Sequence, residues 1–123
     1  MNFNLPNGEK FILIGKGSYN QGDPCRIEIE QGCDYISYTD ENDYTKRRPI
    51  INKKIPVTDD LYVTVTTPTL FDPAFVCIHQ DSKSEDGYDL WYGLRNKKNV
   101  QKLISILEMN GIKVVINKPT KKA

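Results

Sequence analysis

The fold of this chain is decided by the stretch from Arg95 to Ile116, RNKKNVQKLISILEMNGIKVVI. Its apolar residues recur at helical spacing and predict an amphipathic helix over about 97–110, with a stripe made of Val100, Leu103, Ile104 and Leu107. Asn96 is a favourable N-cap residue. Gly111 suits the position after the helix, where a left-handed backbone is common. The following residues, 112–116, are predicted to form a short strand.

The charges of this helix are reversed relative to its dipole. Arg95, Lys97 and Lys98 crowd its start, and Glu108 lies near its end. A helix N-terminus carries partial positive charge, so each exposed basic residue there costs about 0.3 kcal/mol or more. The cap, the apolar stripe and the closing glycine explain the helix without these cations. We therefore expect an anionic or acidic partner beside them.

Six further strands are expected upstream of the helix, because apolar residues alternate or cluster between turn residues. Their ranges are 10–14, 25–30, 35–39, 61–67, 74–79 and 89–94. Segment 74–79 is nearly continuously apolar, so it is expected to be buried on both faces. The pattern predicts an α+β fold, with a mainly antiparallel sheet of about six to seven strands and one C-terminal amphipathic helix followed by a short strand. A single domain is expected over 1–117, and a flexible basic tail over 118–123.

The segment from Asp40 to Lys54 is predicted to be a long loop, acidic at its start and basic at its end. Pro49 and Pro56 bracket the basic part and argue against a regular central strand. If this loop folds over the helix start, its arginines, Arg47 and Arg48, join the cations of the helix in one basic pocket. Arginine suits forked contact with phosphate or carboxylate. The alternative is that these cations are dispersed and solvated.

Tyrosine and tryptophan are frequent, with seven Tyr and one Trp. Both residue types favour interfaces, because they combine an apolar body with a polar tip. We expect Tyr38, Tyr44 and Trp91 to contact a partner or ligand. The alternative is that such aromatic residues pack at the edge of a half-exposed sheet.

The composition excludes several classes of protein. A formal net charge of +1 over 123 residues argues against a general nucleic-acid binder. No stretch approaches the ~18 apolar residues of a membrane span, and the first residues lack the pattern of a secretory signal. Three cysteines are too few for a disulfide framework, so a cytoplasmic location without membrane association is expected. Abundant lysine, isoleucine and asparagine are typical of phages, mobile elements and low-GC bacteria.

Signals for catalysis are weak. The pair Gly15 and Gly17 after a strand resembles the start of the protein-kinase glycine loop, but the third glycine is replaced by Asn20. His79 is the only histidine, and Cys77 lies two residues before it in an apolar run. There are no closely spaced cysteine pairs for zinc. We therefore expect no enzyme, no cofactor and no metal, and an activity centred on His79 is a minor alternative.

These observations predict a small non-enzymatic binding protein that acts through a protein–protein interface, as an inhibitor or an adaptor. The main alternative is a binder of an anionic small molecule or nucleotide at a basic pocket near the helix N-terminus. Self-association into a homo-oligomer is a further alternative.

Overall fold

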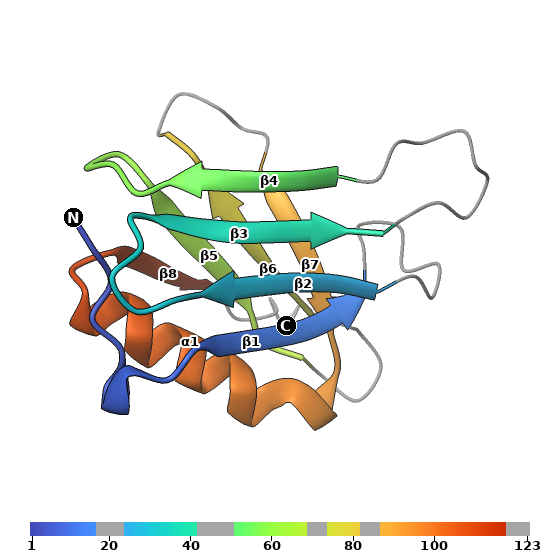
Figure 1. Cartoon of the computed structure of the whole chain (residues 1–123). Helices are drawn as coiled ribbons and strands as arrows, with labels where there is room; N and C mark the ends of the chain where they lie inside the picture. Colours follow the sequence, from blue (N-terminus) through green and yellow to red (C-terminus); the bar gives the residue numbers. More distant parts are fainter. Residues whose placement is uncertain (17–23, 42–50, 69–73, 82–86, 118–123) are drawn as a thin grey trace.

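The computed structural model describes residues 1–16, 24–41, 51–68, 74–81 and 87–117. Within them, one eight-stranded sheet is accompanied by one α-helix (Figure 1). The strands are β1 (Phe11–Lys16), β2 (Pro24–Ile29), β3 (Tyr35–Asp40), β4 (Ile51–Pro56), β5 (Tyr62–Thr66), β6 (Ala74–His79), β7 (Tyr88–Tyr92) and β8 (Lys113–Asn117). The helix is α1 (Lys97–Met109), and short 3₁₀ turns, η1 and η2, span Pro6–Gly8 and Leu94–Asn96.

The sheet consists of two antiparallel meanders that meet at one corner. Its strand order is β4-β3-β2-β1-β7-β6-β5-β8. The first meander, β1 to β4, joins the second, β5 to β7, through the single pair Lys16↔Trp91. After β7, α1 returns the chain to the far edge, where β8 pairs with β5 in parallel. Figure 1 shows the first meander crossing in front of the second, with α1 running along β1 and β8.

The core lies between the two meanders and α1. Inward residues alternate along β2, β3 and β5, as their burial patterns show. Apart from Asp40, these buried residues form one apolar cluster with Val100, Leu103, Ile106 and Leu107 of α1. The helical stripe was therefore predicted almost correctly, although Ile106 is buried and Ile104 only partly so.

Both ends of α1 fall where the sequence predicts them, but the N-cap residue does not make the expected capping hydrogen bond. Gly111 has a left-handed φ of 78°, and its N–H donates to the Glu108 carbonyl at 3.0 Å. The Ile112 N–H donates to the Leu107 carbonyl at 2.9 Å, which completes a Schellman motif. Asn96 occupies the N-cap position, but its side chain makes no capping bond. Its Nδ2 instead donates to the Ile14 carbonyl at 2.9 Å, because β1 lies within reach.

The expected α+β class is confirmed, whereas the strand count of six to seven is wrong. The additional strand is β4, which begins in the last part of the segment predicted to be a loop and ends two residues after it. It lies at a sheet edge, where a strand needs a partner on one side only, and Ile55 is its one buried residue. Pro56 is accommodated because it ends this edge strand. The described part of the chain contains no helix with the length and apolar character of a membrane span.

Candidate functional site

Strand β1 is paired along its full length on one side only. Six residue pairs connect β1 to β2, whereas β7 contributes the single pair Lys16↔Trp91. Gly15 allows β7 to approach β1 closely at this point, because a Cβ atom at Gly15 would lie only 2.5 Å from Cδ2 of Leu90 in β7. Between Phe11 and Gly15, no described strand pairs with the other edge of β1, which faces α1 (Figure 1). This open edge is the defining feature of the candidate site.

The register shows which backbone groups face the open edge. In an antiparallel pair, the N–H and C=O of one residue point to the same side, and consecutive residues alternate. The Ile14 carbonyl accepts a hydrogen bond from the side chain of Asn96, the residue before α1, so this carbonyl points away from β2. The backbone of Ile12, two residues earlier, points the same way. Leu13 and Gly15 direct their backbone groups toward β2.

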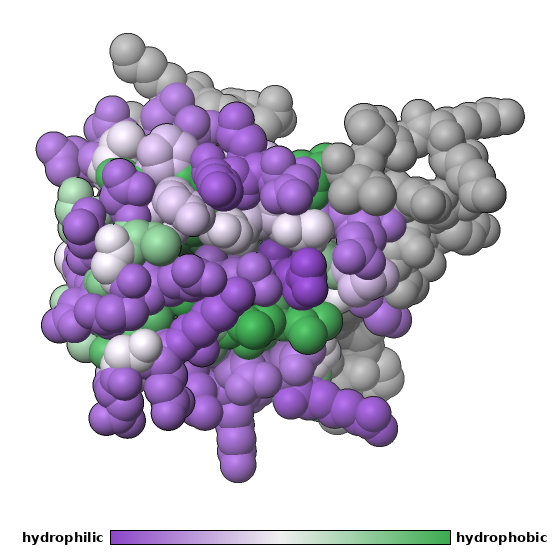
Figure 2. Space-filling view, in the orientation of Figure 1, coloured by the Kyte–Doolittle hydropathy of each residue, from purple (hydrophilic) through white to green (hydrophobic). Residues whose placement is uncertain are grey.

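The outer face of β1 carries two adjacent exposed isoleucines. Ile12 is 44% exposed and Ile14 is 54% exposed, whereas Leu13 between them points into the core. Glu28 and Arg26 of β2 lie opposite these isoleucines in the register. Figure 2 shows a hydrophobic patch in the region of β1, surrounded by hydrophilic surface.

A groove of about 650 Å³ separates the start of β1 from α1. Its walls come from the segment before and at the start of β1 and from one face of α1: Pro6, Asn7, Glu9, Lys10, Phe11, Lys98, Gln101, Lys102, Ser105 and Ile106. A second hollow of about 380 Å³ lies at the other end of β1, where Ile14, Gly15, Lys16, Trp91, Tyr92, Gly93 and Asn96 line it. The two hollows mark opposite ends of the open edge. We call the first of them the β1–α1 groove.

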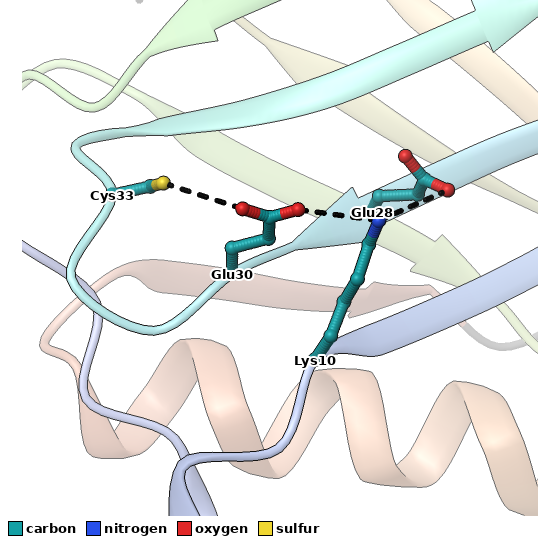
Figure 3. A network of polar contacts seen from close by, with 4 residues as sticks. All are labelled: Lys10, Glu28, Glu30 and Cys33. Carbon is teal, nitrogen blue, oxygen red and sulfur yellow. Dashed lines mark hydrogen bonds and ion pairs between the residues drawn. The ribbon is translucent and has the colours of Figure 1, made fainter.

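The lysines that line the groove differ in whether they form ion pairs with described residues. Lys10 Nζ lies 3.2 Å from Oε1 of Glu30 and 3.7 Å from Oε1 of Glu28. Figure 3 shows the Lys10 side chain reaching both carboxylates. The hydrogen bond to Glu30, followed by the charge of Glu28, raises the pKa of Lys10. By contrast, Lys98 and Lys102 form no ion pair with any described residue. Their charges remain available to a partner.

The predicted site residues are only partly brought together. Lys98 lines the β1–α1 groove, and Trp91 lines the second hollow. The ring of Trp91 lies 5.4 Å from that of Phe75, and its enclosed Nε1 has no hydrogen-bond partner among the described residues. Arg95 and Lys97 are exposed beside the helix start and line neither hollow. Tyr44, Arg47, Arg48 and the tail 118–123 lie outside the described residues.

Tyr38 was wrongly predicted to be an exposed contact residue. Only 1% of it is accessible, and its hydroxyl donates to the Asp89 carbonyl at 2.5 Å. Its ring lies 5.2 Å from that of Tyr88, and burial is the main reason that its pKa is raised. Tyr38 shares the inner face of β3 with Ile36, and β7 covers that face. It is a core residue.

The surroundings of His79 do not resemble an activated catalytic pair. Its Nε2 lies 3.1 Å from the Thr64 hydroxyl, and its ring stacks on Tyr62 with centroids 4.3 Å apart. Burial lowers the pKa of His79 and raises that of Cys77. A nucleophilic cysteine needs a lowered pKa. In the described ranges, no group of three or more His, Cys, Asp or Glu residues is placed to hold a metal ion.

Sequence reasoning missed the residues that define the open edge. Ile12, Ile14, Lys10 and Lys102 were not predicted to belong to a site. One local signal was available, since Phe11 to Ile14 is apolar on both faces of a strand. Such a strand is either buried on both sides or exposes apolar surface.

Comparison of the chain with protein-family models, curated proteins and solved structures finds no match. The function is therefore argued from the open edge of β1 and the groove beside it.

Proposed function

We propose that this protein is a small non-enzymatic binding protein that acts on another protein, as an inhibitor or adaptor, through the outer face of β1 and the β1–α1 groove. One observation carries the proposal. Ile12 and Ile14 are exposed side by side on a strand whose far edge pairs with β7 at one residue only. Exposed apolar residues on an unpaired edge favour association with another chain.

The apolar contribution can be estimated from the exposure of the two isoleucines. About half of each side chain remains accessible, and full burial of an isoleucine contributes about 2 kcal/mol. Covering the remaining halves therefore contributes about 1 kcal/mol each, or about 2 kcal/mol together. This amount corresponds to about a 30-fold change in affinity.

A capture experiment with matched variants tests the proposal. The bait is the full chain, as wild type or as Ile12→Thr with Ile14→Thr, which keeps β-branching and removes apolar surface. The control is Ile51→Thr with Ile116→Thr, because those residues are 42% and 51% exposed on the two outer strands of the sheet. Quantitative mass spectrometry of proteins captured from the source organism identifies the partner, and titration of that purified partner measures affinity.

We expect the β1 pair of substitutions to weaken binding by about 30-fold and the control pair to leave it within about twofold. Equal retention of every captured protein by both variants would contradict the proposal. Circular dichroism of each bait establishes that the fold is intact.

A second candidate is a binder of an anionic small molecule or nucleotide at the hollow beside the start of α1. This hollow places Trp91, which can stack on a base, near Lys16 and a helix start that lacks a capping side chain. Thermal-shift assays with ATP, GTP and inorganic phosphate test it. A ligand-induced rise in Tm that disappears in Lys16→Glu, which reverses the charge of a residue lining the hollow, would support this candidate, and a panel without any shift would reject it.

A further inference from the structure

We infer that the segment bound at this site is an extended acidic peptide that adds to the open edge of β1 as an extra strand. This inference rests on the proposed protein-binding function and specifies its mode. Strand addition requires backbone groups that face the open edge, space beside them, and side chains that select the sequence of the added strand.

The backbone groups come from the even-numbered residues of β1. Both backbone groups of Ile12 and the N–H of Ile14 point toward the open edge, and the Ile14 carbonyl already accepts from Asn96. No described strand pairs with β1 at these residues. An incoming strand can form main-chain hydrogen bonds there, as in recognition by strand addition.

The space for the added strand lies between β1 and α1. The β1–α1 groove opens at the Phe11 end of β1, and the second hollow opens at the Ile14–Lys16 end. Six residues of strand extend about 20 Å. A segment of about six residues therefore matches the length of β1 between the two hollows.

Side chains on the two faces select different residue types. Side chains of the added strand alternate between the two faces of the sheet. Those on the outer face lie beside Ile12 and Ile14, so apolar residues fit there. Those on the other face meet the exposed row of α1 that lines the groove: Lys98, Gln101, Lys102 and Ser105.

Charge complementarity determines which residue types of the added strand fit on the side that faces α1. Lys98 and Lys102 have no described ion-pair partner, and Lys97 is exposed one residue before Lys98. Glu9 is the one acidic residue among the described residues that line the groove. The row on α1 is therefore positively charged, and aspartate or glutamate fits opposite it. The expected motif alternates apolar and acidic residues.

The probe is a phage-displayed library of random 12-residue peptides, selected on the immobilised full chain. The most enriched peptide is then synthesised, and its affinity is measured for a set of variants. Lys98→Glu with Lys102→Glu removes the charge row, and Lys53→Glu with Lys113→Glu is its control, because those exposed lysines lie on β4 and β8. Ile12→Pro removes one edge-facing N–H, whereas Ile12→Val keeps it.

We expect enriched peptides to alternate apolar and acidic residues over at least about five positions. The Lys98/Lys102 and Ile12→Pro variants should weaken binding by about tenfold or more, and both controls should change it by about twofold or less. Amide hydrogen exchange gives a separate test. The peptide should slow exchange at Ile12 and Ile14 by about tenfold or more, and leave Leu13 and Gly15, which already donate to β2, unchanged.

Several results would overturn strand addition. They are enrichment of basic or non-alternating peptides, failure to enrich any peptide, equal affinity of Ile12→Pro and Ile12→Val, or no slowing at the Ile12 and Ile14 amides. If a captured partner still depends on Ile12 and Ile14 under those results, the protein-binding function holds and its mode is different. If capture is also independent of both isoleucines, the proposed function fails as well.

Discussion

Gly15 lies where β7 passes close to β1. Its replacement by alanine tests the close approach of these two strands at the corner where the two meanders meet. A Cβ atom at this position would lie 2.5 Å from Cδ2 and 2.9 Å from Cγ of Leu90, and it would also overlap the backbone carbonyl of Trp91. Leu90 is fully buried, so its side chain has no free space to move into. The strands must therefore separate to accommodate the methyl group.

The expected loss of stability follows from the groups that the new methyl group displaces. Overpacking of a well-packed core costs about 1–3 kcal/mol. Because a buried side chain and a strand backbone both have to shift, we expect Gly15→Ala to lower the free energy of unfolding by about 3 kcal/mol. For a chain of this size, that loss lowers Tm by about 10 °C.

Gly93→Ala is the matched control. Gly93 lines the same hollow as Gly15, but its φ of −116° suits any residue, and a Cβ atom there meets nothing within 4 Å. Alanine at such a position stabilises a protein by about 0.5 kcal/mol, because it restricts the unfolded chain. The two substitutions should therefore act in opposite directions.

Urea denaturation of the two variants and the wild type measures the difference, provided that the m-values agree. Gly15→Ala should unfold at a lower urea midpoint, and Gly93→Ala at the wild-type midpoint or above. If both variants unfold at the same midpoint, β7 does not pass Gly15 at this distance, and the close crossing of β1 and β7 is refuted.

Three further predictions concern the core and the helix end. Tyr38→Phe removes the hydrogen bond to the Asp89 carbonyl and should lower the free energy of unfolding by about 1 kcal/mol in urea, whereas an unchanged midpoint would indicate an exposed tyrosine. Burial lowers the pKa of folded His79 below its ordinary value of 6.5, so its stabilising contribution is present above pH 6.5 and is lost as pH falls through the folded pKa. The unfolding free energy of His79→Gln should therefore fall less steeply than that of the wild type as the pH is lowered below 6.5. Denaturation at a series of pH values measures this, and equal slopes of unfolding free energy against pH in the two proteins would refute it. Gly111→Ala should cost about 1 kcal/mol in thermal denaturation, because φ is 78° there, and an unchanged Tm would exclude a left-handed residue at this position.

Predictions about the fold were correct where neighbouring residues determine the structure. The end of α1 depends on Gly111 and the carbonyls of the preceding turn, all within a few residues of one another. Asn96 is the N-cap residue, as predicted, but its side chain does not cap the helix, because it bonds instead to the Ile14 carbonyl, which is distant in the sequence. Strand β4 was missed because its consecutive polar residues, Asn52 to Lys54, resemble a loop, and its pairing with β3 joins residues outside this local pattern.

The candidate site was predicted to a smaller extent. Lys98 and Trp91 line hollows, and their contact with a partner stays a prediction, whereas Tyr38 is in the core. The frequency of tyrosine suggested contact residues, but it could not show that β7 covers the face of β3 that carries Tyr38. Ile12 and Ile14 are candidates because β1 lacks a second full partner, and only the strand pairing shows this.

The sequence by itself determined the α+β class, the amphipathic helix with its Gly111 end, and the concentration of cations at the helix start, because periodicity and turn chemistry act over a few residues. The tertiary structure alone decided that β7 meets β1 at one pair, that α1 lies beside the open edge, and that Lys98 and Lys102 face a groove there. Contacts such as Asn96 to Ile14 and Tyr38 to Asp89 join residues far apart in the chain, and they form only when both meanders and the helix pack together. The exposed face of β1 is a product of that packing.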